Sequence, residues 1–447
     1  MTPEIKKRIE QIRRGEVPER YKRTNVGILP EEWNVIHLSK VLKKQTQKNI
    51  DSSIAHVLTN SATQGIVDQI EYFDKQIAND DNINGYYIVK NGYFVYNPRI
   101  SANAPCGPFN RYNGTETGIM SPLYTVYKFI GDSYCSEFLT HYFDSTSWHR
   151  YMNNIANYGA RSDRMNVTSN DMNLLPLPNP PLPEQQKIAA ILTTQDRIIA
   201  LQQQKIEEIQ RLKKACLTKM FPKKGSAVPE IRFPGFNGSW ERRRFSEVFD
   251  FTIPNNTLSR AELSYESGSV LNIHYGDVLI KYDSVLDVQS DEIPYIIGKN
   301  RKDFEGALLQ DGDIIIADTA EDETTGKACE ICNLQGSDIV SGLHTIVCRP
   351  LLSMVSGYLG YYLNSDSYRN QLLPLMQGIK VLSLSRTNLQ KTMVSYPADY
   401  DEQSHIASFF YNLDHLITLH ERKLEEMQKF KKALMQLLLT GIVRVNV

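Results

Sequence analysis

The chain has 447 residues, of which 41% are hydrophobic and 23% are charged. That is enough apolar material to bury two or three domain cores. The 50 Lys and Arg residues nearly cancel the 51 Asp and Glu residues, which gives a formal net charge of -1. The chain as a whole therefore has no net attraction for nucleic acid, and any binding of a polyanion must come from local clusters of Lys and Arg.

Three classes of protein do not fit the sequence. No apolar run approaches the ~20 residues that cross a bilayer, and the charged start MTPEIKKRIEQIRRG is not typical of a signal peptide. The six cysteines are scattered, as in a protein kept reduced in the cytoplasm. Cys329 and Cys332 form a CxxC pair, but no second pair stands at ligand spacing. We therefore expect a cytoplasmic protein without a metal site and without a membrane association.

The periodicity of the sequence predicts five segments in chain order. Strand-like alternation occurs in YYIVKNGYFVYNPRI and PLYTVYKFI, and again in DVLIKYD and DGDIIIADT. Short helices are predicted at Cys135–Phe143 and Ser356–Asn364. The five segments are a basic helical arm (1–25), a mixed α+β half (26–183), a long helix (184–222), a linker with a second mixed half (223–400) and a second long helix (401–441).

The sequence contains an internal repeat. EQQKIA from Glu184 returns as EQSHIA from Glu402, and Lys213-Lys214-Ala215 returns as Lys431-Lys432-Ala433. GILPEEW matches PGFNGSW, and SPLYTV matches SGLHTI, in the same order along the chain. The chain is therefore predicted to be a duplicated unit of one globular half followed by one long helix.

Each long helix carries an apolar seam with alternating three- and four-residue spacing. Because each seam is too narrow to bury itself, we expect the helices to pair with each other, and the intervening globular half favours an antiparallel pair. The predicted fold is α+β, with two mixed α/β domains joined by a long antiparallel two-helix coiled coil, as a pseudo-twofold tandem repeat. The residues predicted at the helix interface are Ile188, Ile191, Ile198, Leu212, Ile406, Phe409, Leu413, Leu416 and Met427.

One stretch resembles a catalytic motif. Asn179-Pro180-Pro181-Leu182 lacks the aromatic fourth residue that amino-methyltransferases use, and the second half has Val394-Ser-Tyr-Pro397 at this place. No glycine-rich cofactor loop, phosphate loop, GxSxG or HExxH occurs. The acidic stretch between residues 311 and 323 is interpreted as solvated carboxylates. We interpret Asn179–Leu182 as the start of a helix and assign no catalytic residue.

PLPEQQKIAAIL with KIEEIQRLKKACLTKMF, and DEQSHIASFF with KLEEMQKFKKALMQLLLTG, resemble the central and distal conserved regions of the specificity subunit of Type I restriction-modification systems. The resemblance extends over essentially the whole chain, with 26–183 and 223–400 as target-recognition domains. It implies a subunit without an active site, whose two domains each read one half of a bipartite site in double-stranded DNA. It also implies two adenine-N6 methyltransferase subunits docked on the helices, and restriction (nuclease) subunits in the assembly. S-adenosylmethionine, ATP and magnesium are expected in these partners, and no cofactor in this chain.

Base reading needs hydrogen-bonding side chains backed by phosphate contacts. The repeated loop Tyr158-Gly-Ala-Arg161 and Gln377-Gly-Ile-Lys380 is the favoured place for such contacts. The full set of candidates is Lys43, Lys44, Lys48, Asn60, Thr63, Gln64, Arg161, Arg164, Arg260, Asn272, His274, Lys380 and Arg386. Two other functions stay open from the sequence: a fused adenine methyltransferase working through Asn179, and a coiled-coil scaffold whose lobes bind protein or carbohydrate.

Overall fold

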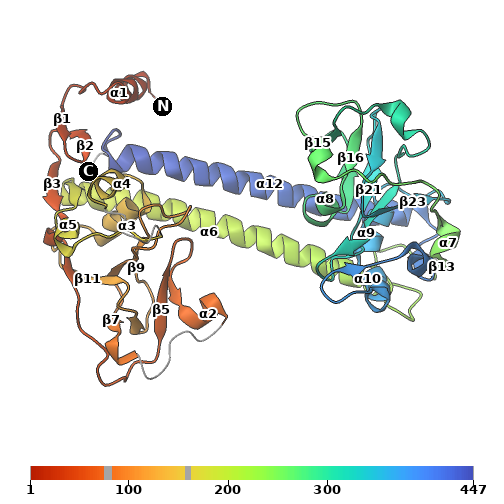
Figure 1. Cartoon of the computed structure of the whole chain (residues 1–447), viewed down its shortest axis with the longest axis horizontal. Coiled ribbons are helices and arrows are strands. Elements are labelled where there is room, and N and C mark those ends of the chain that lie inside the picture. The colour runs from red at the N-terminus through yellow and green to blue at the C-terminus, as the bar shows by residue number, and fades with distance from the viewer. Residues whose placement is uncertain (1, 75–82, 157–162, 446–447) are drawn as a thin grey trace. The chain divides into compact units, whose positions relative to one another are not determined.

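The computed structural model describes residues 2–74, 83–156 and 163–445. The chain divides into two compact units: unit 1 is Met1–Leu201 with Leu424–Val447, and unit 2 is Gln202–Lys423. Figure 1 labels the elements of both. Among the described residues, none of the helices combines the length and the hydropathy that a membrane crossing needs.

Unit 1 is mixed α+β. Its helices are α1 (Pro3–Arg13), α2 (Gln69–Phe73), α3 (Ser136–Asp144), α4 (His149–Ile155), α5 (Ser169–Asn173), the first part of α6 (Leu182–Lys219) and the last part of α12 (Tyr400–Leu439). Its strands are β1 (Tyr21–Thr24), β2 (Gly27–Pro30), β3 (Asn34–His37), β4 (Leu42–Lys44), β5 (Val57–Ser61), β6 (Gly65–Asp68), β7 (Tyr87–Val89), β8 (Phe94–Tyr96), β9 (Phe109–Arg111), β10 (Gly118–Met120), β11 (Thr125–Phe129) and β12 (Pro176–Asn179).

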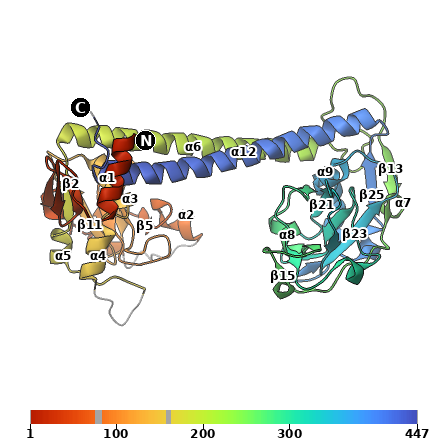
Figure 2. The same cartoon turned by 90° about the horizontal axis from the view of Figure 1, so that it is seen from above.

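Two four-stranded sheets form the body of unit 1. One has the order β6-β5-β10-β7, with β5 and β10 parallel, and the other has the order β4-β11-β8-β9. Buried aromatic rings fill the core between the second sheet and α3, with the rings of Phe109 and Phe143 stacked at 3.9 Å between centroids. Figure 2 shows α3, α4 and β11 close together in this unit. Large flat side chains suit this place because each removes a large apolar area from water.

Unit 2 repeats the arrangement. Its helices are the rest of α6 and α12 with α7 (Phe245–Val248), α8 (Tyr275–Ile280), α9 (Tyr358–Asn364), α10 (Asp366–Leu372) and α11 (Arg386–Leu389). Its strands are β13 (Glu241–Arg244), β14 (Phe249–Asp250), β15 (Leu263–Ser264), β16 (Leu271–Ile273), β17 (Val285–Asp287), β18 (Tyr295–Ile296), β19 (Ile314–Ala317), β20 (Thr319–Ala320), β21 (Ala328–Cys332), β22 (Ile339–Ser341), β23 (Thr345–Pro350), β24 (Leu382–Ser383) and β25 (Met393–Tyr396).

The strand pairing confirms the duplication that the sequence predicts. The five-stranded sheet β14-β23-β19-β21-β17 corresponds to the second sheet of unit 1, and the sheet β15-β18-β16-β22 corresponds to the first. The parallel pair β16 and β22 stands where β5 and β10 stand in unit 1. The short helices predicted near residues 135 and 356 are present as α3 and α9.

Both long helices are observed, and within each unit their segments pack together. In unit 1, Ile188 and Leu192 of α6 share a buried cluster with Leu438 and Leu439 of α12, and Asp196 forms an ion pair with Lys431. In unit 2, the side-chain amide of Gln202 donates to the carbonyl of His420 at 2.8 Å, and Lys213 forms an ion pair with Asp414. Asp196 and Asp414 are equivalent in the repeat, as are Lys431 and Lys213. The same contact is therefore made twice.

Burial corrects part of the predicted seam. Ile188, Ile191, Ile406, Phe409, Leu413 and Met427 are buried or half-buried. Ile198, Leu212 and Leu416 are instead exposed, whereas Leu192, Ile206 and Ile209 are buried. The reason is that a helix turns every 3.6 residues, so a stripe extrapolated with a strict 3.5-residue repeat drifts around its surface.

Candidate nucleic-acid interface

The repeated Glu-Gln pair at the start of each long helix is buried and structural. In unit 1, Glu184 accepts hydrogen bonds from the indole of Trp33 at 3.0 Å and from Nε and Nη2 of Arg444 at 2.6 and 2.8 Å. In unit 2, Glu402 accepts from Arg232 at 2.7 and 2.8 Å and from Trp240 at 3.3 Å. A buried carboxylate needs such a full set of donors. The repeated Glu therefore holds each long helix against its globular half.

The neighbouring Gln explains the Pro-rich stretch. The amide of Gln185 donates to Oδ1 of Asn179 at 3.0 Å and to the carbonyl of Pro180 at 2.8 Å, and its oxygen accepts from the backbone of Cys135. Gln403 makes the corresponding contact to the carbonyl of Pro397 at 2.8 Å. Asn179 thus ends strand β12 and braces the start of α6, which supports its interpretation as a helix-start residue.

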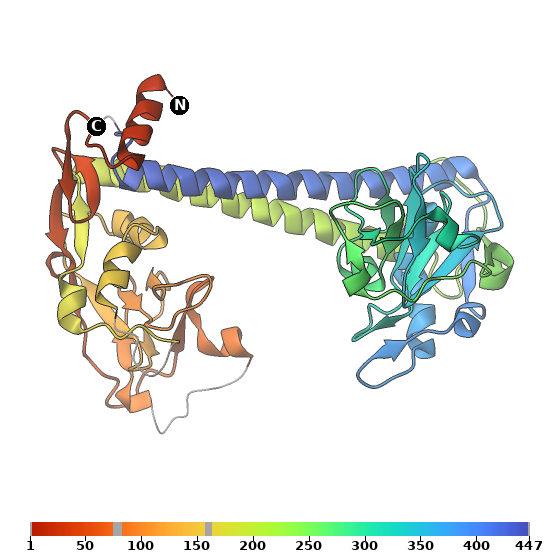
Figure 3. The same ribbon diagram turned by 45° about the horizontal axis from the view of Figure 1, so that its top comes forward.

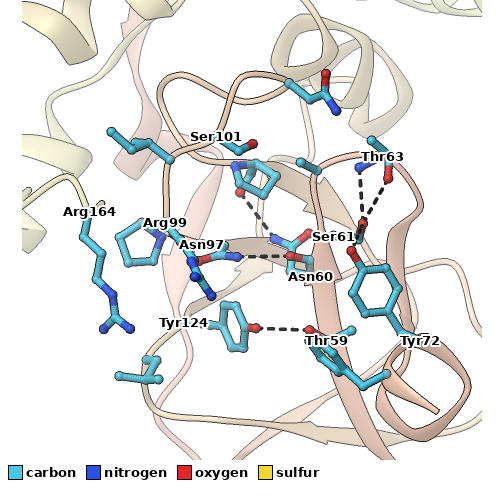
Figure 4. A pocket seen from close by; sticks show the side chains of 17 residues that line it. Thr59, Asn60, Ser61, Thr63, Tyr72, Asn97, Arg99, Ser101, Tyr124 and Arg164 are labelled. Atoms are coloured by element: carbon cyan, nitrogen blue, oxygen red, sulfur yellow. Dashed lines mark hydrogen bonds between the residues drawn. The ribbon is translucent and has the colours of Figure 1, made fainter. Parts of the chain in front are cut away.

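A pocket of about 440 Å³ opens in unit 1 near the ends of β5 and β8. Figure 4 shows its floor, where the hydroxyls of Thr59 and Tyr124 lie 3.1 Å apart. On one wall, the hydroxyl of Ser61 lies 3.3 Å from the hydroxyls of Thr63 and Tyr72. The pocket therefore offers hydroxyl donors and acceptors beside an aromatic ring, as a surface that contacts nucleobases requires.

Asn60, a predicted contact residue, braces this pocket from beneath. Its side chain is buried, donates to the carbonyl of Val95 at 2.8 Å and accepts from Asn110 at 2.7 Å. Asn97 donates to the backbone carbonyl of Asn60 at 3.1 Å (Figure 4). The predicted residues Thr63 and Gln64 lie in the exposed turn that joins β5 to β6.

Two arginines stand at the mouth of the pocket. Arg99 and Arg164 are paired through their backbones and both line the pocket. The buried Nε of Arg164 has no hydrogen-bond partner among the described residues, and its distance to a carboxylate oxygen of Asp163 is 3.9 Å. Arg99 likewise has Asp163 as an ion-pair partner, at 4.0 Å. Two guanidinium groups that share one distant carboxylate retain donors suited to phosphate. Arg164 was predicted from the sequence, but Arg99 was missed; the predicted Arg161 lies outside the described residues.

The predicted basic cluster before this region lies apart from the pocket. Lys43 and Lys44 are exposed residues of β4, and the Lys44 ammonium donates to the hydroxyl of Ser169 at 3.0 Å. Lys48 is exposed and pairs through its backbone with Tyr87. None of the three lysines lines the pocket.

Unit 2 has different side chains at the corresponding strand ends. His274 caps α8, and its Nδ1 accepts from the backbone of Gly276 at 3.1 Å. Burial lowers the pKa of His274, and nearby Asp277 opposes this shift. The ring of Tyr275 lies between His274 and His344, at 4.6 and 5.3 Å between centroids. His344 places Nδ1 at 3.3 Å from a carboxylate oxygen of Asp318. The sequence analysis predicted His274 as a contact residue but did not predict His344.

Three other predicted residues of unit 2 are engaged inside the unit. Asn272 is fully buried and accepts from Asn256 at 2.7 Å. Arg260 pairs with Asp277 at 2.5 Å, and this hydrogen bond raises the pKa of the guanidinium. Arg386 donates to the carbonyl of Phe251 at 3.3 Å. These contacts position the strand ends.

The predicted residue Lys380 stands at the tip of a tight hairpin. Gln377 and Ser383 close the hairpin with two backbone hydrogen bonds of 3.0 and 2.8 Å. Lys380 is exposed, and its neighbour Ile379 is fully exposed at 101%. The hairpin continues into β24, which pairs with β20 directly after Asp318. Lys380 is therefore carried by a hairpin that is attached beside the His344 cluster.

Comparison with known proteins agrees with this architecture. Residues 30–211 match the family model described as the Type I restriction modification DNA specificity domain. The Type I restriction enzyme MjaVIII specificity subunit of Methanocaldococcus jannaschii is 26% identical over 285 residues, which cover 60% of this chain and 62% of that relative. The putative type I restriction enzyme MjaX specificity subunit of the same organism is 23% identical over 457 residues, covering 96% of this chain and 97% of that one.

The fold also matches a solved structure. A chain from a structure that describes complex assembly and conformational transition of the type I R-M system superposes with a TM-score of 0.58 at 15% identity, covering 93% of this chain and 99% of the other. This match shows the fold, and the sequence matches are to the specificity-subunit class, which is a non-catalytic DNA-recognition class. Residues 30–211 match the specificity-subunit family that the sequence predicted, and the chain is similar to such a subunit over almost its whole length.

Proposed function

We propose that this chain recognises a bipartite site in double-stranded DNA, with each unit reading one half. The observation that carries the proposal is that the two units share the same strand pairing but have different side chains beside the ends of the equivalent strands. In unit 1, Thr59 of β5 and Tyr124, which lies between β10 and β11, line the pocket. In unit 2, His274 follows β16 and His344 lies between β22 and β23. An asymmetric DNA site requires this combination, because the two halves differ in base edges but share the same backbone.

The two long helices act as the spacer in this proposal. A helix of 38 residues, the length of α6, is about 57 Å long at ~1.5 Å per residue. Half-sites one turn of DNA apart are separated by ~34–36 Å, which such a helix can span. An antiparallel coiled coil of α6 and α12 would hold two recognition domains at a fixed separation. The ion pairs Asp196–Lys431 and Asp414–Lys213 support it, because they fix the register of the helices within each unit.

Exposed apolar side chains on the helices support docking of two identical partners. The exposed residues form three equivalent pairs of the repeat, each with one member on α6 and one on α12. The pairs are Ile198 with Leu416 (41% and 39% exposed), Leu201 with Leu419 (64% and 48%) and Leu212 with Phe430 (49% and 57%). Apolar groups that recur on a water-facing side mark an interaction surface. Ile198, Leu212 and Leu416, predicted for the helix interface, are therefore assigned to partner contacts.

The partners that fit this surface are two copies of an adenine-N6 methyltransferase subunit, with restriction subunits joining the assembly in the cytoplasm. In this proposal, S-adenosylmethionine binds the methyltransferase subunits and ATP and magnesium serve the restriction subunits. This chain supplies recognition and spacing only. Asn179 is engaged by Gln185, which removes the support for a fused methyltransferase.

The test is to co-express the chain with its methyltransferase subunit and map N6-methyladenine across the host genome. We expect methylation at one bipartite sequence that disappears when this chain is omitted. Inserting seven residues into both α6 and α12 should change the spacer and leave both half-sequences intact. If methylation does not depend on this chain, or if the insertion changes the half-sequences, the proposal is wrong, and a scaffold for protein or carbohydrate becomes the better interpretation.

A further inference from the structure

We infer that His344 is a specificity-determining residue for the half-site read by unit 2, and that Asp318 positions it. The inference rests on the proposed function and adds to it the kind of base that unit 2 recognises at one position. His344 occupies the place that Tyr124 has in unit 1, because SGLHTI and SPLYTV precede the equivalent strands β23 and β11. Tyr124 forms part of the unit 1 pocket floor.

The backbone that presents the His344 side chain is strained. His344 has a φ of 56°, in the left-handed region that non-glycine residues seldom adopt. Its carbonyl accepts from the backbone of Asp318 at 3.0 Å, and the strand that follows is buried in the five-stranded sheet. The imidazole is nevertheless nearly half exposed, at 47%. Strain that is maintained to keep a polar side chain at the surface is typical of functional positions.

The contacts of the ring select one tautomer. Nδ1 lies 3.3 Å from Oδ1 of Asp318, which also accepts from the hydroxyl of Thr319 at 2.8 Å. A carboxylate beside Nδ1 favours a proton on that nitrogen, which leaves Nε2 of the neutral ring as an acceptor. Tyr275 packs edge-to-face against the ring and restricts its rotation. Nε2 has no partner among the described residues.

An acceptor of this kind has a defined complement in DNA. The exocyclic amino groups of adenine (N6) and cytosine (N4) are the donors exposed in the major groove. Guanine presents only acceptors there, and thymine presents an acceptor and a methyl group. We therefore assign His344 to an adenine or a cytosine, whose major-groove amino group donates to Nε2. Lys380, on the adjacent hairpin, is suited to a phosphate contact that would hold the strand end in register.

The experiment measures methylation specificity in cells for the complete complex with His344→Ala, His344→Gln and Asp318→Asn. For His344→Ala we expect one position of the second half-site to become degenerate, with discrimination falling about tenfold or more. Asp318→Asn should relax the same position to a smaller extent, because the imidazole remains while its tautomer is less fixed. His344→Gln retains an acceptor and should keep part of the preference. Arg243→Ala, at a surface ion pair with Glu241 in the same unit, is the control and should leave both half-sites unchanged.

Selection of bound sequences from random DNA completes the test. If the wild-type complex methylates its site and the His344 variants retain full discrimination, the inference is wrong while the proposed function stands. Loss of binding to every sequence, or a change confined to the first half-site, would also refute it. If the wild-type chain directs no methylation, the proposed function itself fails.

Discussion

In both units a tryptophan and an arginine bind the buried glutamate at the start of a long helix, and this contact is called the clasp below. The segments that supply the clasp are arranged differently in the two units. In unit 2, Arg232 and Trp240 are eight positions apart on one segment, and both hold Glu402. In unit 1, Trp33 precedes the first sheet while Arg444 follows α12, and both hold Glu184. Figure 3 shows α1 close to the end of α12 in unit 1, where Tyr21 donates to the carbonyl of Gly441 at 2.7 Å. The repeat thus preserves the position of the arginine in space, although the arginine comes before the long helix in unit 2 and after it in unit 1.

A second pair of equivalent positions carries opposite charges. Arg111 pairs with Phe94 as Glu330 pairs with Ile314. Arg111 reaches the carboxylate of Glu137 in the first turn of α3 at 2.8 Å. Glu330 instead accepts directly from the backbones of Gly357 and Gly360 at the start of α9, at 2.5 and 2.9 Å. Both solutions stabilise the start of a helix, but their dependence on pH differs in sign.

The largest expected effect comes from removing one arginine of the clasp. Arg444→Ala and Arg232→Ala each leave a buried carboxylate without its charged partner, which costs about 3–5 kcal/mol of unfolding free energy. Hydrogen exchange should show the loss at residues 182–190 for Arg444→Ala and at 400–408 for Arg232→Ala. Arg243→Ala, at a surface pair with Glu241, is the control and should have no measurable effect. Loss of protection at both helix starts from either variant would contradict two separate clasps.

The next effect separates the buried face of α6 from its exposed face. Leu192 is fully buried, and Leu192→Ala should cost about 2–5 kcal/mol because it leaves a cavity. Leu201 is 64% exposed, so Leu201→Ala should change stability by less than about 0.5 kcal/mol. The Leu201 variant should instead weaken binding of the methyltransferase subunit, as measured by calorimetry. Equal destabilisation by both variants would contradict the observed seam.

A smaller effect concerns pH in unit 2. Burial raises the pKa of Glu330 from 4.5 to about 7, although backbone donors partly offset the shift. Because the folded-state pKa is raised, the stability contribution is complete below pH 4.5 and is lost as the pH rises through 7. Glu330→Gln should remove this dependence, on the order of 1–3 kcal/mol, from unfolding curves measured between pH 4.5 and 8. An unchanged slope would show that another group is responsible.

The smallest effect is the opposite one in unit 1. The pKa of Glu137 is lowered from 4.5 to about 2. Burial acts to raise this pKa, but the hydrogen bonds from Arg111, the backbone and Ser136 lower it by more than burial raises it. Because the folded-state pKa is lowered, the stability contribution is present above pH 4.5 and is lost as the pH falls through 2. Glu137 is half exposed, so solvent weakens the effect. Glu137→Gln should reduce acid sensitivity only slightly in melting curves between pH 2 and 5, and a large change would contradict this account.

The duplication, the long helices and the mixed sheets were predictable because periodicity and internal repeats are local properties of a sequence. The helix interface was only partly predictable, since Ile198 and Leu212 fit a heptad but face water. The site was less predictable still. Asn60 and Arg260 are polar residues of the expected kind, but their partners Val95 and Asp277 are distant in the sequence. Arg99 in unit 1 and His344 in unit 2 could be assigned a role only when the fold of each unit placed them beside other candidate residues of the same unit.

The arrangement of the clasp in unit 1 has a consequence for biosynthesis. Ribosomes make Trp33 and Glu184 early, but Arg444 follows every residue of unit 2 in the chain. The ion pair between Glu184 and Arg444 therefore cannot form until residues 202–423 have been translated. Unit 1, whose synthesis begins first, consequently gains its last stabilising contact only after unit 2 has been synthesised.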